Sequence, residues 1–357
     1  MLKHAAERRC SRGRLTRAFT RPPFYDVSGD KGWFGKISRA QQHVVRHLCL
    51  EVAQWPQWTR PLRVAFLADF HTGSHSDDVA RLRSIIAEAA STTPDLVLFG
   101  GDYVNMQLFG GGRVPPRAIA RVLSSIEAPL GLFAVLGNHD YVYDEHAVAD
   151  ALRDSGITVL DHDRYAARFQ GHAIQIIGVP DAHIARPEAS ALLADLSPDM
   201  PTIVLAHDPV WFAHLPAGPH LMLAGHTHGG QIRLPGIGIV KKATKAPRRW
   251  CHGLVEERGQ YLYVTSGIGT SGVPIRWGAP PEFAVLDLIG TVSYATKLDG
   301  FQAQSEFQRV PQECRFLPPT KSMGKSRAAD TSVHCRTMIW EAISSRDFVF
   351  AYNPGRR

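Results

Sequence analysis

The sequence lacks any apolar run of the roughly 18 residues that a membrane-spanning helix needs, so no such helix is expected. It is also poor in cysteine, with five in 357 residues and no Cys-x-x-Cys pair. An odd number without close pairs argues against a disulfide framework and against a zinc site built from thiolates. We therefore expect a reducing compartment, the cytoplasm. No internal repeat is present.

Most of the chain carries little net charge. The formal net charge is +7, but residues 1–22 hold seven basic residues against the single acid Glu7. The remaining residues therefore sum to +1, and the basic composition does not indicate a nucleic-acid partner. Apolar residues make up 44% and charged residues 20% of the chain, as in globular proteins.

The chain divides into three regions that differ in composition and in their pattern of apolar residues. Residues 1–60 form a basic leader, residues 61–290 a dense globular body, and residues 291–357 a polar tail expected to be poorly ordered or loosely packed. Within the leader, apolar residues recur at helical spacing over residues 35–53, with basic residues largely between them. Trp33, Phe34, Trp55 and Trp58 flank this segment.

Two interpretations of the expected amphipathic helix stay open. Its apolar face packs on the body, which we favour slightly. Alternatively, residues 33–58 lie on an anionic membrane surface, which would make the protein peripheral at the inner face of the membrane.

The body alternates short apolar runs with helical stretches. Strands are expected near residues 64–68, 96–99, 132–136, 174–179, 203–206, 221–224, 261–265 and 283–286. Helices are expected over 77–90, 115–126 and 144–154. Continuous apolar strands between helices indicate an α/β fold whose sheet is covered on both faces. The later strands lie closer together, which suggests a mixed sheet or two sheets packed on each other.

Five of these apolar runs end in residue types that bind metals, at the strand edge where open α/β sheets bind ligands. The residues are Asp69 and His71, Asp102, Asn138, His207, and His226 with His228. Seven nitrogen and oxygen donors are too many for one structural zinc ion. They suit two ions that share a carboxylate, and Asp102, which follows Gly100-Gly101, is the natural bridge. Mixed imidazole and carboxylate donors favour Mn, Fe, Zn or Co.

The spacing of the ligand pairs fits an extended chain. Asp69 and His71, like His226 and His228, are two residues apart, and alternate residues of a strand point the same way. We expect each pair to reach one site while Phe70 faces elsewhere. Paired ions of this kind clamp the attacking and leaving oxygens of a phosphoryl displacement.

The ordered blocks Asp-x-His, Gly-Asp, Gly-Asn-His-Asp, a lone His and Gly-His-x-His resemble the calcineurin-like metallophosphoesterase superfamily. The resemblance continues through residues 225–235, 266–271, 274–276 and 280–282. That extended pattern is similar to a bacterial branch of membrane-associated phosphodiesterases, which includes UDP-diacylglucosamine pyrophosphatases. The whole resemblance covers residues 61–288. The resemblance implies a four-layer αββα sandwich, in which two packed mixed β-sheets are flanked by helices.

The resemblance also implies roles for individual residues. One ion would be held by Asp69, His71, Asp102 and His228, and the other by Asp102, Asn138, His207 and His226. A hydroxide that bridges the ions would attack phosphorus. His139 would protonate the leaving oxygen or stabilise the phosphoryl charge, and Asp140 would orient His139.

Two features outside these blocks could touch a substrate. Residues 241–250 hold five cations and no acid, and they either meet anionic headgroups or form a solvated loop. Arg276 is a candidate phosphate contact.

The expected activity is a phosphodiesterase or pyrophosphatase acting on a membrane-derived or nucleotide-lipid phosphate ester. The alternatives are a phosphomonoesterase, a protein phosphatase, a nuclease, a metal-storage protein, and a catalytically idle scaffold of the same fold.

Overall fold

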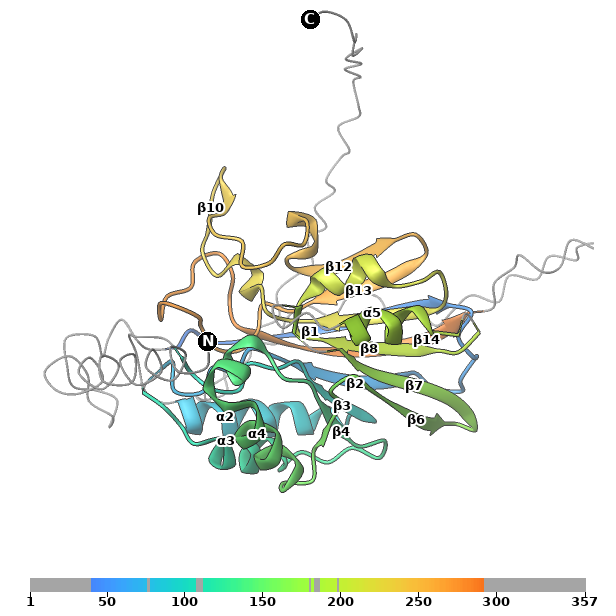
Figure 1. Cartoon of the computed structure of the whole chain (residues 1–357), viewed down its shortest axis with the longest axis horizontal. Coiled ribbons are helices and arrows are strands. Elements are labelled where there is room, and N and C mark those ends of the chain that lie inside the picture. Colours follow the sequence, from blue (N-terminus) through green and yellow to red (C-terminus); the bar gives the residue numbers. More distant parts are fainter. Residues whose placement is uncertain are drawn as a thin grey trace, which may run out of the picture. The chain divides into compact units, whose positions relative to one another are not determined.

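Strands that are apolar on both faces build the centre of this protein. The computed structural model describes residues 40–75, 78–106, 112–179, 181–182, 187–197 and 199–291, which form two six-stranded mixed sheets (Figure 1). The first sheet has the order β1 (Val44–Ala53), β14 (Glu282–Thr291), β2 (Leu62–Leu67), β3 (Leu96–Phe99), β4 (Leu132–Ala134), β5 (Thr158–Val159). The second has the order β12 (Gly253–Glu257), β13 (Gln260–Val264), β9 (His220–Ala224), β8 (Thr202–Ala206), β7 (His172–Val179), β6 (Asp163–Phe169).

Alternate residues of each central strand serve two different cores. In β2, Val64 and Phe66 pack between the sheets, whereas Ala65 and Leu67 face the helices. The helices on that outer face are α2 (Asp78–Ser91), α3 (Pro116–Leu123) and α4 (Asn138–Arg153). The second sheet is covered by α5 (Pro187–Ala194) and the 3-10 helix η2 (Pro209–His214). The predicted sandwich of two mixed sheets flanked by helices is confirmed.

The expectation of a helix over residues 35–53 is wrong for the part of that segment that the structure describes. Residues 44–53 form β1, which pairs in parallel with β14 along its whole length. Leu50 and Val52 point into the core while Cys49 and Glu51 are exposed, which is the two-residue period of a strand. The apolar residues of this segment fit both the helical and the strand period, so the local sequence does not distinguish a helix from a strand. Pairing with a strand more than 200 residues away determines that it is a strand.

The two tryptophans that follow β1 pack against the core between the sheets. The Trp55 indole is buried, donates to Pro219 O at 2.7 Å, and meets Trp58 edge-on at 5.7 Å between ring centroids. Trp55 is therefore unavailable to a membrane, and Trp58 is partly buried against the same core. The predictions for residues 1–39 and 292–357 fall outside the described residues. No helix in the described ranges has both the length and the apolar character of a membrane span.

Parallel strands bring the functional loops to one edge. Strands β2, β3 and β4 run parallel in the first sheet, as do β7, β8, β9 and β13 in the second. The segments that follow β2, β3, β4, β8 and β9 carry the predicted metal ligands. Helix α4 begins at Asn138 rather than at the expected residue 144, so its first turn belongs to this edge.

Candidate metal centre

The predicted ligands from both sheets converge at this edge. Asp69, His71, Asp102, His207, His226 and His228 are all buried, with at most 6% of each residue exposed. Asn138 and His139, in the first turn of α4, are partly exposed and mark the open side of the site. Phe70 points the other way, as expected, and its ring stacks on Tyr103 in the core at 5.3 Å.

The backbone that presents these ligands is not extended, so the strand argument for the paired spacing is wrong. Asp69, His71, Asp102, His226 and His228 all have φ between +38° and +67°. Non-glycine residues rarely adopt this left-handed region, and such strain gathers at functional sites. Tight turns beyond the strand ends aim the side chains. Gly137 allows one close approach, because a Cβ there would lie 2.2 Å from Asp102 Oδ1.

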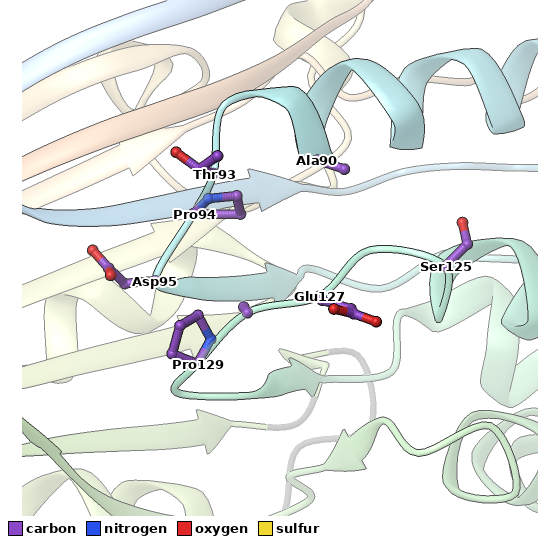
Figure 2. Close-up of a pocket in the computed structure, with 8 residues that line it drawn as sticks. Ala90, Thr93, Pro94, Asp95, Ser125, Glu127 and Pro129 are labelled. Carbon is purple, nitrogen blue, oxygen red and sulfur yellow. The ribbon is translucent and has the colours of Figure 1, made fainter.

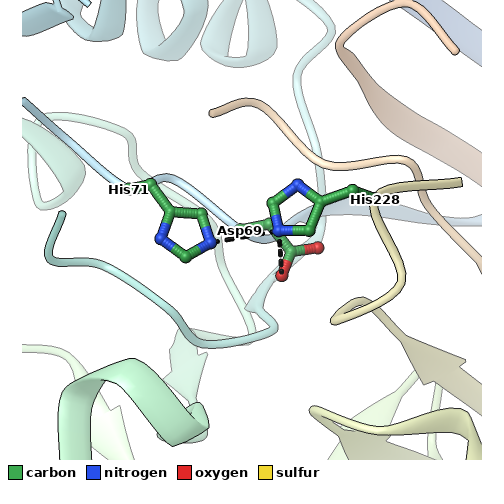
Figure 3. A group of neighbouring side chains, drawn as sticks. All are labelled: Asp69, His71 and His228. Carbon is green, nitrogen blue, oxygen red and sulfur yellow. Dashed lines mark hydrogen bonds and ion pairs between the residues drawn. The ribbon is translucent and has the colours of Figure 1, made fainter. Parts of the chain in front are cut away.

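Asp69, His71 and His228 make up the first cluster, called here the His71 group. Figure 3 shows the two imidazoles facing each other beside the carboxylate. The Nε2 atoms of His71 and His228 are 3.1 Å apart, and His228 Nε2 is 3.9 Å from Asp69 Oδ1. Burial raises the pKa of Asp69 to about 7 and lowers the pKa of His71 to about 3. Both imidazoles are therefore neutral and able to ligate, since burial also lowers the pKa of His228 well below its ordinary value.

Asn138, His207 and His226 form the second cluster with Asp102, called here the His207 group. His207 Nε2 lies 3.1 Å from His226 Nδ1 and 3.2 Å from Asn138 Oδ1. The outer ring nitrogens face backbone carbonyls, His207 Nδ1 at 2.7 Å from Gly100 O and His226 Nε2 at 3.2 Å from Ala243 O. Because a carbonyl only accepts, these outer nitrogens carry ring protons, and the inner nitrogens are the ones that can present lone pairs to an ion.

The Asp102 carboxylate lies between the two clusters. Its Oδ2 is 3.3 Å from His71 Nε2 and 3.3 Å from His207 Nε2. Burial alone would raise the pKa of Asp102, but His207 and His139 hold it well below its ordinary value, so the carboxylate is charged. Burial opposes charge on His207, yet Asp102 raises the pKa of that ring well above its ordinary value. The position between them demands a cation, either a proton or a metal ion.

The spacings fit metal coordination. Two ligands that are each about 2.1 Å from one ion lie about 3.0–3.4 Å apart at tetrahedral or octahedral angles. The ligand-atom separations of 3.1–3.3 Å around Asp102 Oδ2 and His207 Nε2 match this range. Three sets of side chains could hold an ion: Asp69, His71 and His228; His71, Asp102 and His139; and Asp102, His207 and His226. The residues therefore fit a site for two ions that share Asp102.

His139 and Asp140 take different positions. The His139 ring meets His71 edge-on at 4.7 Å between centroids, and its Nε2 lies 3.3 Å from Ser271 Oγ. Asp140 is fully buried and accepts hydrogen bonds from the backbone N–H groups of Gly137, Asp102, Tyr103 and Val104. Its carboxylate thus fixes the turn that carries Asp102, and these contacts do not include the His139 ring that it was expected to orient.

Arg276 is a residue whose role the sequence did not reveal. Its guanidinium is buried and donates to the backbone carbonyls of Ser266, Gly267, Gly269, His228 and Ala279. It also approaches His228 Nδ1 at 3.2 Å. With these donors engaged, it holds the 266–269 segment and His228 in place instead of meeting a phosphate. Five carbonyl partners cannot be read from a Pro-Ile-Arg pattern.

Asp181 is a second such residue. It lies beyond β7, outside every motif, and is fully buried. It adds to the effect of Asp102 and Asp69, which raise the pKa of His207, and it partly opposes the burial that lowers the pKa of His226.

A depression of about 620 Å³ lies at the opposite, amino ends of β3 and β4 (Figure 2). Its buried carboxylate, Asp95, is held by two 2.7 Å hydrogen bonds from the Arg60 guanidinium and one from Arg63 N. None of the predicted ligands lines this depression, and its carboxylate is already satisfied, so we assign the chemistry to the metal centre.

The chain is similar to known metal-dependent hydrolases. Residues 62–230 match the family described as calcineurin-like phosphoesterase. The chain is 30% identical over 267 residues to the phosphodiesterase YaeI of Escherichia coli, covering 73% of this chain and 90% of that protein. It is 26% identical over 278 residues to the UDP-2,3-diacylglucosamine pyrophosphatase LpxG of Chlamydia trachomatis, covering 63% of this chain and 83% of the relative.

Among solved structures, the NAD nucleotidase of Haemophilus influenzae aligns with a TM-score of 0.38 and 15% identity, over 57% of this chain and 44% of that one. The family match begins at β2 and ends just beyond His228, and so contains every predicted ligand. Together with the match to YaeI, this shows that the chain belongs to the calcineurin-like phosphoesterase family of metal-dependent hydrolases.

Proposed function

We propose that this protein is a phosphodiesterase or pyrophosphatase that works with two divalent ions of Mn, Fe, Zn or Co. The His71 group and Asp102 would hold one ion, and the His207 group the other. The observation that carries the proposal is the place of Asp102, whose Oδ2 is equally distant, 3.3 Å, from a ring nitrogen of each cluster. A carboxylate in that position serves two ions at once.

When bound, such ions lower the pKa of water and neutralise charge on the phosphoryl oxygens. The protein's own residues position the reaction. Asp140 and Gly137 fix the turn that carries Asp102, and Asp102 Oδ1 in turn accepts a 2.8 Å hydrogen bond from His139 N. The His139 ring stands at the partly exposed rim, where it can donate a proton to the leaving oxygen or a hydrogen bond to the phosphoryl group.

The substrate class is proposed from the relatives. YaeI is named a phosphodiesterase, and LpxG a pyrophosphatase of a diacylated nucleotide sugar. Both names describe a phosphorus atom that bears two substituents, which favours diesters or pyrophosphates over monoesters. A membrane-derived or nucleotide-lipid phosphate ester is therefore the substrate that we propose. A cytoplasmic location stays a prediction.

The test compares hydrolysis of bis-p-nitrophenyl phosphate with that of p-nitrophenyl phosphate, using metal-stripped protein with Mn²⁺, Zn²⁺ or Mg²⁺ added back. We expect metal-dependent turnover that is faster on the diester. Asp102→Ala should lower turnover by about a thousandfold or more and should also lose bound metal. Asp163→Ala, which removes an exposed carboxylate on β6, is the matched control.

His139→Ala separates catalysis from metal binding. We expect turnover to fall by about a hundredfold while both ions remain bound, because general acid–base groups typically contribute this much. His146→Ala, an exposed histidine on the same helix, should change neither quantity. Two bound ions without turnover on either substrate would contradict the proposal on these substrates and favour the idle scaffold. A faster monoester reaction would favour a phosphomonoesterase.

A further inference from the structure

An exposed apolar surface adjoins the metal centre. It consists of six large side chains, called here the apolar rim: Leu234, Ile237, Val240, Val273, Ile275 and Trp277. Ile237 is 66% and Trp277 61% exposed. Single exposed apolar residues are ordinary, but six large ones on two neighbouring loops form a patch of the kind that marks an interaction site.

The rim is a built feature rather than a loose loop. Its first part is the hairpin of β10 (Arg233–Leu234) and β11 (Gly238–Ile239), which projects from the body in Figure 1. Its second part is the segment 271–278. Two backbone hydrogen bonds join the two parts, one from Arg233 N to Trp277 O and one from Trp277 N to Gln231 O. The Gln231 side-chain amide also donates to Ser271 O and Val273 O. Ile239 anchors the hairpin by packing against Gly230.

Both parts of the rim are tied to the catalytic residues. The hairpin follows directly on the 3-10 helix η3 (His228–Gly230), which carries a ligand of the His71 group. The other segment begins at Ser271, whose Oγ lies 3.3 Å from His139 Nε2. A molecule seated on the rim is therefore next to the open side of the metal centre.

The sequence around the hairpin is basic and free of acids. Between Asp208 and Glu256 there is no acidic residue, while Arg233, Lys241, Lys242, Lys245, Arg248 and Arg249 fall in this span. Lys241, Lys245 and Arg248 are exposed. Arg249 is already paired with Glu257. Lys241, Lys245 and Arg248 form no ion pair with a carboxylate in the described part of the chain, so the rim combines protruding apolar side chains with positive charge. An exposed tryptophan suits the polar–apolar boundary of a bilayer.

We propose that the apolar rim docks this protein on an anionic lipid surface, with Ile237 and Trp277 entering the interface and the cations of residues 241–248 facing the headgroups. Charge complementarity selects this occupant. A second copy of the chain would bring like charges together, and a purely apolar partner would leave the cations unused. The inference goes beyond the proposed chemistry, since binding to lipid needs neither metal nor turnover.

The test is flotation of the full chain with vesicles of phosphatidylcholine, or of phosphatidylcholine mixed with phosphatidylglycerol. We expect binding to the mixed vesicles to be at least about tenfold tighter and to weaken with salt. Replacing Ile237 and Trp277 together by serine should weaken it by about tenfold or more. Replacing Tyr165 and Leu254 by serine, two exposed apolar residues on the edge strands β6 and β12, is the matched control and should leave it unchanged.

Every variant keeps the basic residues 1–22, so their attraction to anionic lipid is common to all and cancels in the comparison. Hydrolysis of bis-p-nitrophenyl phosphate and the melting temperature should be the same in Ile237→Ser as in the parent, which separates docking from folding. Equal vesicle binding by the rim variant and the parent would overturn the proposal. It would also be overturned if the parent is a dimer that binds no vesicles and the rim variant is a monomer. Vesicle binding without diester hydrolysis would instead contradict the proposed function and leave the rim intact.

Discussion

The two metal-ligand clusters differ in what surrounds their outer ring nitrogens. In the His207 group, carbonyl oxygens of Gly100 and Ala243 face these nitrogens and direct lone pairs inward. In the His71 group, a donor faces one of them, since Arg276 Nη2 lies 3.2 Å from His228 Nδ1. Arginine only donates, so this contact leaves the ring proton of His228 on Nε2, toward His71. His71 Nδ1 has no hydrogen-bond partner among the described residues.

This difference sets the order in which ions should bind. The His207 group offers two imidazoles that carbonyls orient beside a charged carboxylate, and only the extra proton of His207 must leave. The His71 group must first turn the His228 proton away, beside the positive charge of Arg276. Carbonyl or carboxylate partners of a ligating histidine typically strengthen metal affinity by about 10–100-fold. We therefore expect the His207 group to fill first and the His71 group to hold its ion more weakly.

The largest effect on metal content should come from two single variants, each of which removes one imidazole from a different cluster. His207→Ala should leave less than one ion per chain after dialysis, because the tight site is lost and the weak one exchanges. His71→Ala should keep about one ion, and both should lower turnover by about a hundredfold or more. Metal analysis of the dialysed proteins measures the contrast. Equal metal loss in the two variants would contradict the inferred difference in affinity between the two clusters.

Arg276→Lys tests the unusual partner of His228. Lysine cannot reach the five carbonyls that the planar guanidinium contacts, so we expect a loss of about 2–4 kcal/mol in the free energy of unfolding. The weaker metal-binding step should change while the tight one does not, because the guanidinium both positions His228 and keeps its ring proton on Nε2. Arg258→Lys, an exposed arginine with one backbone contact to Phe212 O, is the control. Chemical denaturation and metal titration give the two readouts, and an unchanged weak step would argue that Arg276 does not position His228.

A smaller effect on metal affinity is expected from loosening the loop that presents Ala243 O. Thr244 Oγ1 donates to Asp208 Oδ1 at 2.6 Å and holds this loop beside His226. Thr244→Val should weaken only the tight step, by about three- to tenfold, since the carbonyl partner of His226 loses its support. Thr59→Val removes another hydroxyl hydrogen bond, to Gln170 Oε1, and should leave both steps unchanged. A selective change in the weak step would contradict our account of the two clusters.

The ligand types and their order along the chain could be predicted from the sequence, because apolar runs and the polar residues at their ends are local signals. The backbone conformation of those ligands could not, since tight turns with positive φ place Asp69 and His71 where an extended chain was expected. The partners of His228 and Asp102 also escaped prediction. Arg276 and Asp140 act through backbone groups that have no sequence signature.

Strand β1 shows the same limit at the level of the fold. Arg46 Nε donates at 2.9 Å to Glu282, a fully buried carboxylate that also meets His252 Nε2 at 3.0 Å. These partners lie over 200 residues from Arg46, so nothing in the local pattern of residues 44–53 reveals them. Long-range pairing overrides an apolar period that suits a helix equally well.

The most direct test of the two-ion centre is calorimetric titration of metal-free protein with Zn²⁺, at pH 6 and pH 8 in buffers of different ionisation heat. We predict two ions per chain in two unequal steps. At pH 8 the pair should displace about one side-chain proton, from His207, whose pKa Asp102 raises well above its ordinary value, and any metal-bound water that ionises adds to the total. At pH 6 it should displace about two, because Asp69, with a pKa of about 7, then carries a proton that must also leave. A single ion per chain, or two equal binding steps, would contradict the account.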